Sequence, residues 1–206
     1  VYKRQIPIGE LHMLLNKDPQ SEKLRRTQAI ANLLFQFCGM PFSDLAHLEK
    51  SNLERGLLKY NRTKTGTPMS IEVLESAQNA IGGLYNKSDA RSSGYPDYLF
   101  RILSGAYKRN EEGAYREYQS ALRRFNNELK SLSRKLRLHS PVTSYTLRHS
   151  WATTAKYRGV PIEMISESLG HKSIKTTQIY LKGFELEERT KVNKLNYSYV
   201  CNFKML

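Results

Sequence analysis

The chain has 206 residues, 39% of them hydrophobic, which is enough for one domain, or one domain with an appendage, around a buried core. Lys and Arg (33) outnumber Asp and Glu (19), giving a formal net charge of +14. Such a field attracts polyanions, so nucleic acid is the first partner to test, although a protein from a basic proteome would carry the same charge. No apolar run approaches the roughly 20 residues of a membrane span. Two distant cysteines, Cys38 and Cys201, form no zinc pattern or disulfide scaffold, which indicates a reducing cytoplasm.

The first half of the chain predicts helices around one β-hairpin. Apolar residues recur at helical spacing in several segments. Helices are predicted at 9–16, 21–37, 42–48 and 74–85. Residues 56–62 and 67–73 predict antiparallel strands joined by the turn Lys64-Thr65-Gly66. Residues 86–97 have the composition of a loop.

The second half predicts further helices. Residues 114–137 form a long basic helix whose charges are a solvated face or a DNA contact. The expected helix boundaries are a cap at Ser144, a stop at Gly159, a start at Pro161 and a stop at Gly170. A short helix carries Thr176, Thr177 and Tyr180, and the last helix is predicted at 185–196.

Four side chains of the sequence have the chemistry that phosphoryl transfer requires. Arg148 could donate a forked pair of hydrogen bonds to phosphate oxygens, and His171 could donate another. Tyr180 could attack phosphorus, and Lys64 in a hairpin could protonate the leaving oxygen. Each residue alone also fits a structural role: any one of 13 tyrosines is usually packing or surface, and a histidine after a helix-ending glycine commonly caps carbonyls.

Several segments resemble the motifs of the tyrosine recombinase (phage integrase) catalytic domain and occur in the same order along the chain. Their residues are most similar to those of integrases from bacterial mobile elements. They are 39–45 (GMPFSDL), 64–66 (KTG), 145–153 (YTLRHSWAT), 169–171 (LGH) and 176–180 (TTQIY). The separations 148 to 171 (23 residues) and 171 to 180 (nine) match the family layout, and the resemblance runs from about 9 to 196. It implies a mainly α fold with a small antiparallel β-sheet. It also implies site-specific DNA recombination, for integration or excision, through a 3′-phosphotyrosyl intermediate.

The resemblance assigns a role to each matching position. Arg148 would clamp the scissile phosphate, and His171 would donate to the same group. Lys64 would protonate the 5′-oxygen, and Tyr180 would be the nucleophile. His149 would support the site from behind Arg148. No metal or other cofactor is expected.

Two positions depart from the family pattern. Where relatives usually carry His or Lys, this chain has Tyr145, a poor base near neutral pH whose role stays open. The second phosphate-clamping arginine of box I is expected immediately before Gly39 or two residues after it. These positions hold Cys38 and Pro41, and Cys38 looks like the substituted one. Losing one preorganised donor costs on the order of 10²–10³ in rate. The hypothesis is a chain that binds DNA but is catalytically impaired. In the alternative, Cys38 is a small core residue, an arginine elsewhere serves instead, and Asp44 buttresses box I in either case.

The resemblance also implies a domain organisation and partners. Residues 1–183 would be the catalytic domain, and 184–206 a C-terminal helix and tail that is the candidate for exchange between protomers. The family's N-terminal core-binding domain is expected to be absent from this chain. Expected partners are double-stranded DNA and further copies of the chain, in a bacterial cytoplasm, with no membrane and no small-molecule cofactor.

Another class of function stays open. Residues 160–180 can be interpreted as a helix-turn-helix with 173–181 as recognition helix, which would make the protein a non-catalytic DNA-binding regulator. An inactive recombinase descendant lies between the two. A metal-dependent nuclease is disfavoured because the sequence has no acidic cluster with ligand spacing.

Overall fold

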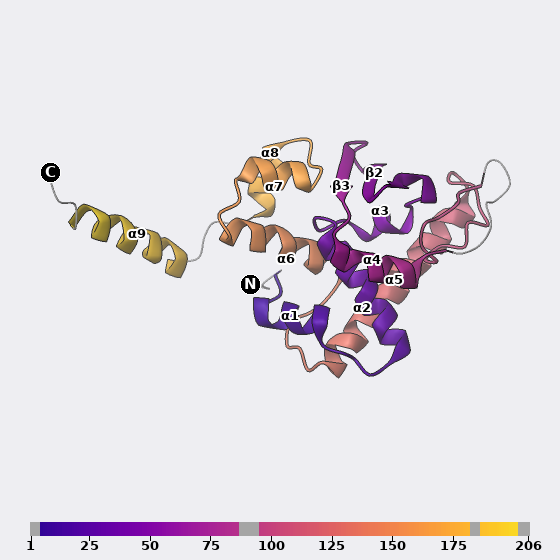
Figure 1. The fold of residues 1–206 in the computed structure, drawn as a ribbon, viewed down its shortest axis with the longest axis horizontal. Coiled ribbons are helices and arrows are strands. Elements are labelled where there is room, and N and C mark those ends of the chain that lie inside the picture. The colour runs from indigo at the N-terminus through magenta and orange to yellow at the C-terminus, as the bar shows by residue number, and fades with distance from the viewer. Residues whose placement is uncertain (1–4, 87–94, 182–185, 202–206) are drawn as a thin grey trace.

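The computed structural model describes residues 5–86, 95–181 and 186–201, so most of the predicted loop at 86–97 lies outside the described residues. The described chain is mainly helical with a small antiparallel sheet, as predicted (Figure 1). The helices are α1 (Ile8–Asn16), α2 (Glu22–Gln36), α3 (Phe42–Ala46), α4 (Glu75–Leu84), α5 (Glu112–Lys135), α6 (Ser144–Tyr157), α7 (Ile162–Ser168), α8 (Ile174–Tyr180) and α9 (Leu186–Cys201), with a 3₁₀ turn η1 (Lys50–Asn52). None of them, within the described ranges, is long and apolar enough to cross a bilayer.

The sheet has three strands in the order β1-β2-β3. They are β1 (Leu53–Glu54), β2 (Leu57–Asn61) and β3 (Pro68–Glu72), each antiparallel to its neighbour. The predicted hairpin is confirmed as β2 and β3, with Asn61 opposite Pro68. β1 was not predicted, because two residues are too few to show a period of two.

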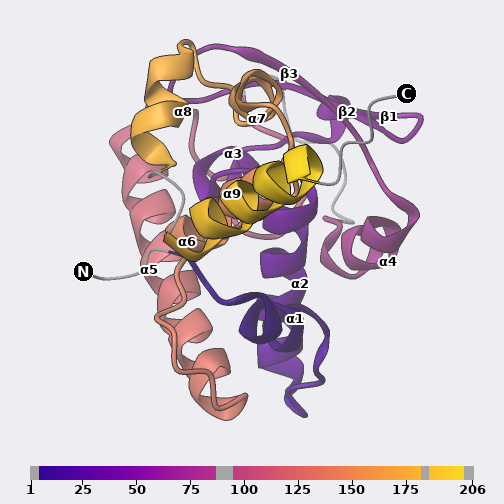
Figure 2. The ribbon, with the colours of Figure 1, turned by 90° about the vertical axis from the view of Figure 1, so that its left-hand side faces the viewer.

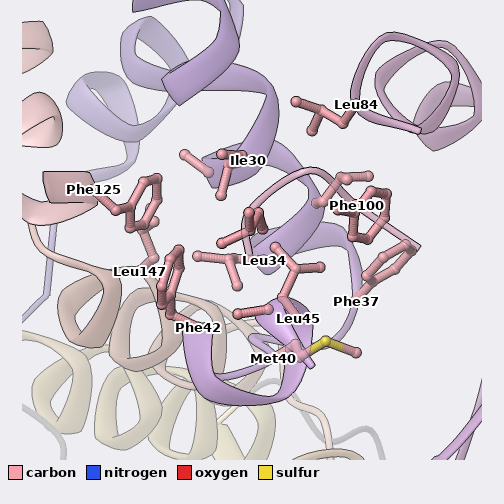
Figure 3. Packing of buried hydrophobic residues seen from close by; sticks show 14 of the residues in the cluster. Ile30, Leu34, Phe37, Met40, Phe42, Leu45, Leu84, Phe100, Phe125 and Leu147 are labelled. Atoms are coloured by element: carbon pink, nitrogen blue, oxygen red, sulfur yellow. The ribbon is translucent and has the colours of Figure 1, made fainter. Parts of the chain in front are cut away.

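The main core surrounds α2, which packs against α4, α5 and α6. The predicted apolar face of α2 is buried at Leu33, Leu34 and Phe37. Figure 3 shows Phe42 and Phe125 together beside Leu34, and their rings stack with centroids 4.8 Å apart. The apolar residues Phe125, Leu129 and Leu132 of α5 are likewise buried, while the basic residues of this helix face outward.

A second, smaller core joins α6 to α7 and α8. Its buried members are Ala152, Ile165, Leu169 and Leu181. Leu147, five residues before Ala152 on the same helix, belongs to the main core instead. α6 therefore crosses the boundary between the two cores, and the residue at that boundary is Arg148.

The helix boundaries test the predicted caps. Gly159 and Gly170 follow α6 and α7 in the left-handed region (φ +79° and +64°), which confirms both stops. The prediction that Ser144 caps α6 is wrong, because Thr143 is the N-cap. Its side chain accepts from the Thr146 backbone N–H, and the Thr146 hydroxyl accepts from the Thr143 N–H. α3 ends at Ala46, earlier than predicted, and α9 continues to Cys201.

Candidate active site

Arg148 is a buried arginine, 7% exposed, on α6. Its Nη1 donates to the Gly39 carbonyl at 2.8 Å, and its Nη2 donates to the Leu169 carbonyl at 2.7 Å. Gly39 permits this approach, because a Cβ there would lie 3.3 Å from the Arg148 Cα and 3.1 Å from the Trp151 Cβ. The guanidinium is therefore fixed between the segment after α2 and the end of α7.

His171 is held by the turn that ends α7. Its N–H donates to the Ser166 carbonyl and the Gly170 N–H donates to the Glu167 carbonyl, a Schellman motif. The ring Nε2 lies 3.3 Å from Arg148 Nη2, and Nδ1 lies 2.8 Å from Thr177 Oγ1. Since a guanidinium only donates, Nε2 is the acceptor and Nδ1–H donates to the Thr177 hydroxyl. Burial first, and then the charges of Arg148, Arg62 and Lys64, lower the pKa of His171 to about 4, so the ring is neutral at pH 7.

The Lys64 turn touches the same α7 turn. Thr65 Oγ1 donates to the Gly170 carbonyl at 3.4 Å, and the Gly66 N–H closes the hairpin onto the Arg62 carbonyl at 2.8 Å. Gly66 has φ +68°, the left-handed conformation expected of glycine in this turn. Lys64 is exposed, and its charge reaches His171.

Two residues of the site were not predicted. Arg62, 6% exposed, ion-pairs through Nε with Asp44 Oδ2 at 2.9 Å and donates through Nη1 to the Leu169 carbonyl. Thr177, fully buried on α8, is the partner of His171. The alternation of Leu58, Tyr60 and Arg62 toward the interior was a signal for Arg62 in the sequence.

Cys38, where the sequence analysis expects the box I arginine, adjoins this site. Cys38 follows α2 with φ +55°, one residue before the Gly39 carbonyl that accepts from Arg148. Burial raises the pKa of its thiol. Asp44, 2% exposed on α3, accepts the Thr63 N–H at 3.2 Å through Oδ1, so it ties box I to the hairpin.

Three further predicted residues lie on α6 and α8. Tyr145 is half exposed, and its ring stacks against that of His149 with centroids 6.4 Å apart. His149 is buried beside Arg148 in the sequence. Tyr180 is the last residue of α8, one turn after Thr177, and its side chain lies outside the described part of the structure. Within the described ranges, no group of three or more His, Cys, Asp or Glu side chains is placed to hold a metal ion.

Known proteins are similar to this chain in sequence. The chain is 30% identical over 185 residues to a probable integrase/recombinase protein of Methanocaldococcus jannaschii, covering 86% of this chain and 52% of that protein. It is 29% identical over 187 residues to tyrosine recombinase XerD of Halalkalibacterium halodurans, covering 86% and 56%. The chain thus spans about half the length of these relatives.

Solved recombinase structures have the same fold. XerA recombinase superimposes with a TM-score of 0.62 at 22% identity, over 98% of this chain and 64% of that one. The Tn1549 transposon integrase, in complex with a circular intermediate DNA, gives 0.63 at 15% identity over 92% and 65%. The fold is therefore that of a tyrosine recombinase catalytic domain. Residues 8–186 match the phage integrase family, and the chain belongs to that family.

Gly170 and Gly159 provide a test of how tightly the α7 turn is packed. Both have positive φ, but a Cβ at Gly170 would lie 2.9 Å from Arg62 Cγ and 2.8 Å from Met69 Sδ, whereas a Cβ at Gly159 meets nothing within 4 Å. We expect Gly159→Ala to cost roughly 1–2 kcal/mol of unfolding free energy for the left-handed backbone. Gly170→Ala should cost roughly 1–3 kcal/mol more for overpacking. Urea unfolding of both variants measures the difference, and equal losses would contradict the described packing.

The neutral His171 predicts how stability depends on pH. Its pKa in the folded chain, about 4, is below its ordinary value of 6.5, so between these values the unfolded chain binds more protons. The contribution of His171 to stability is therefore complete above pH 6.5 and falls as the pH is lowered toward 4. We expect His171→Gln to flatten this part of the stability profile, and His12→Gln, at an exposed position, to leave it unchanged. An NMR titration of His171 with a midpoint near 6.5 would refute the prediction.

Proposed function

We propose that this chain is the catalytic domain of a site-specific DNA recombinase, which cuts and rejoins strands through a 3′-phosphotyrosyl link. The observation that carries the proposal is the convergence of Arg148, His171 and the Lys64 turn on the Leu169–His171 turn. These residues come from three separate segments, and packing alone gives no reason to gather two cationic side chains beside a histidine. The DNA in the Tn1549 integrase structure and the difH substrate in the XerH recombinase structure support DNA as the substrate class.

The charge balance of the site suits a phosphodiester. The described residues include three buried ionised side chains at this place: Arg62, Arg148 and the single carboxylate of Asp44. The two guanidiniums together create a positive field at this place, and such a field favours an anionic ligand. A scissile phosphate is a ligand of this kind and accepts hydrogen bonds from a guanidinium.

The proposed cleavage step breaks one bond and forms one. The Tyr180 oxygen attacks phosphorus after its proton passes to solvent, and the bond from phosphorus to the 5′-oxygen breaks. Lys64 gives a proton to that oxygen, and the reverse step rejoins the strand. Because the phosphotyrosyl ester conserves the bond energy, the step needs no nucleotide.

His171 changes its hydrogen bonding in this proposal. In the DNA-free structure Nε2 accepts from Arg148, so it carries no hydrogen for a phosphate. Once the phosphate engages Arg148, the ring can take the other tautomer, with Nε2–H donating to the phosphate. The Thr177 hydroxyl permits this change because it can donate to Nδ1 as readily as accept from it.

Cys38 is the proposed defect. A side chain at this position starts one residue from the Gly39 carbonyl that anchors Arg148, so an arginine here would have its origin beside the site. A thiol whose pKa is raised by burial is uncharged near neutral pH and cannot replace a guanidinium. We therefore propose that the chain binds DNA but cleaves it slowly.

Covalent capture tests the reaction and the defect together. The substrate is a nicked suicide DNA carrying the cognate site, and the protein–DNA adduct is resolved on a denaturing gel. We expect a weak adduct from the parent chain and an adduct rate higher by on the order of 10²–10³ for Cys38→Arg. Adding Tyr180→Phe to Cys38→Arg should abolish the adduct, since the attacking oxygen is removed.

The control for this assay is binding of the same DNA, which Tyr180→Phe should leave within a few-fold of the parent. If bound DNA gives no adduct with any variant, the protein is a DNA-binding relic, or a regulator that reads DNA with α7 and α8 as a helix-turn-helix. If Cys38→Arg cleaves no faster than the parent, the explanation of the defect is wrong.

We further propose that the C-terminal helix mediates assembly on DNA. Residues 189–198 of α9 are all exposed, among them the apolar side chains of Val192, Leu195 and Tyr197. Figure 1 draws α9 extending away from the other described elements, and Figure 2, with that side turned to the viewer, shows α9 in front of α6. An exposed helix with three large apolar side chains is suited to a neighbouring protomer.

A pair of substitutions tests this assembly. We expect Val192→Ser with Leu195→Ser to reduce the multimer formed on a two-site DNA at least tenfold, while binding to a single site stays unchanged. Native gels and light scattering measure both. The matched control is Ile8→Ser with Leu74→Ser, two exposed apolar residues elsewhere. Unchanged multimer formation by the α9 variant would exclude this role.

A further inference from the structure

Arg62 is an ionised side chain on the interior face of the sheet. Leu58 and Tyr60 precede it on that face of β2, while Lys59 and Asn61 point to solvent. Arg62 is the residue after β2 and only two residues before Lys64. A guanidinium that is 6% exposed requires fixed partners.

Those partners belong to two different elements. Nε lies 2.9 Å from Oδ2 of Asp44, whose side chain is fully buried on α3. Nη1 donates to the Leu169 carbonyl, at the end of α7. The same carbonyl accepts from Arg148 Nη2 at 2.7 Å, so two guanidiniums from separate elements share one acceptor.

We infer that Arg62 is a positioning residue for strand cleavage: its guanidinium bridges Asp44 and the Leu169 carbonyl, and so fixes Lys64 and His171 relative to Arg148. This inference rests on the proposed function and adds a residue to it. Both ends of this bridge are close in sequence to the residues that it positions. Arg62 lies two residues before Lys64, and Leu169 lies two residues before His171.

The bridge is the main polar link described between the hairpin and the α7 turn. The other link, from Thr65 Oγ1 to the Gly170 carbonyl, is longer at 3.4 Å and uncharged. The Arg62 stem also packs on Gly170, where an added Cβ would lie 2.9 Å from its Cγ and 3.0 Å from its Cδ. Both contacts hold the turn that carries His171 against the turn that carries Lys64.

Arg62 does not take the place of the missing box I arginine as a phosphate clamp. Its side chain is buried, and the carboxylate of Asp44 already neutralises its charge. The positioning depends on the planar guanidinium, which holds a carboxylate and a carbonyl at fixed spacing, whereas a lysine presents one point charge. Arg62→Lys should therefore retain the charge and lose the geometry.

A second consequence follows from the charge itself. Arg62 is among the groups that lower the pKa of His171, after burial and Arg148. Removing the charge should move the His171 titration upward toward its ordinary value. This readout depends on the distance between the two side chains and not on overall stability.

The experiment uses the full chain with Cys38→Arg as the parent, so that cleavage is measurable. Three variants are added: Arg62→Lys, Asp44→Asn alone, and Arg62→Met with Asp44→Asn. The double variant removes both charges and leaves no buried carboxylate unpaired, which protects the fold. The matched control is Arg55→Met, which removes a charge from an exposed position on the same sheet, in the turn between β1 and β2.

The expected results separate positioning from binding and from folding. Adduct formation on saturating suicide DNA should fall on the order of 100-fold in Arg62→Lys and in the double variant, because small displacements of reacting groups have effects of this size. Asp44→Asn keeps the bond to Leu169 and should lose less. DNA affinity should stay within threefold for all variants, and Arg55→Met should match the parent in every assay.

NMR titration of His171 tests the inference without requiring DNA cleavage. The pKa of His171 should rise in the double variant and stay unchanged in Arg62→Lys and Arg55→Met. Cleavage within threefold of the parent in both Arg62 variants, together with an unmoved His171 titration, would overturn the inference. A loss of DNA affinity that accounts for the loss of cleavage would also overturn it, since Arg62 would then be a phosphate contact. If the parent itself forms no adduct, the proposed function fails, and the titration alone decides whether Arg62 is placed against His171.

Discussion

The geometry of the site depends on the carbonyl oxygen of Leu169. The Schellman motif after α7 satisfies the Ser166 and Glu167 carbonyls with the N–H groups of His171 and Gly170, so the Leu169 carbonyl remains available outside the helix. Arg148 from α6 and Arg62 from the hairpin both donate to it. One backbone oxygen thus joins the end of α7, which belongs to the smaller core, to α6 and to the hairpin, whose Leu147 and Leu58 lie in the main core.

Gathering two guanidiniums at one point is unfavourable unless polar groups surround them. Asp44 neutralises Arg62, and Arg148 donates to the carbonyls of Gly39 and Leu169. Burial first, and then the charges of Arg148, Arg62 and Lys64, keep His171 neutral. In the proposed function, the same positive charges favour a phosphate over water at this place.

The sequence predicted the helices and their stops better than the contacts that make the site. Gly159 and Gly170 were recognisable, because a glycine after an amphipathic run is the usual end of a helix. Thr143 and Ser144 are both residues that commonly cap a helix. What decides between them is the hydrogen bond from the Thr143 N–H to the Thr146 side chain, which only the folded geometry reveals. Arg62 was harder to assign: the alternation with Leu58 and Tyr60 places it on the interior face, but a charged residue at a strand end is ordinarily solvated. Its burial depends on Asp44, on another element, and no local pattern reveals that partner.

The structure also explains how position 38 can change without loss of the fold. Arg148 is anchored by the backbone carbonyl of Gly39, and no side chain at position 38 is needed for that bond. The left-handed φ of Cys38 strains cysteine and arginine alike, since both carry a Cβ. In the proposed function, an arginine at position 38 would add a charge to the site, while the contacts of Arg62 with Asp44 and Leu169 would hold the remaining residues in place. Because the framework of the proposed site does not depend on the side chain at position 38, we expect DNA binding to persist where cleavage is weakened.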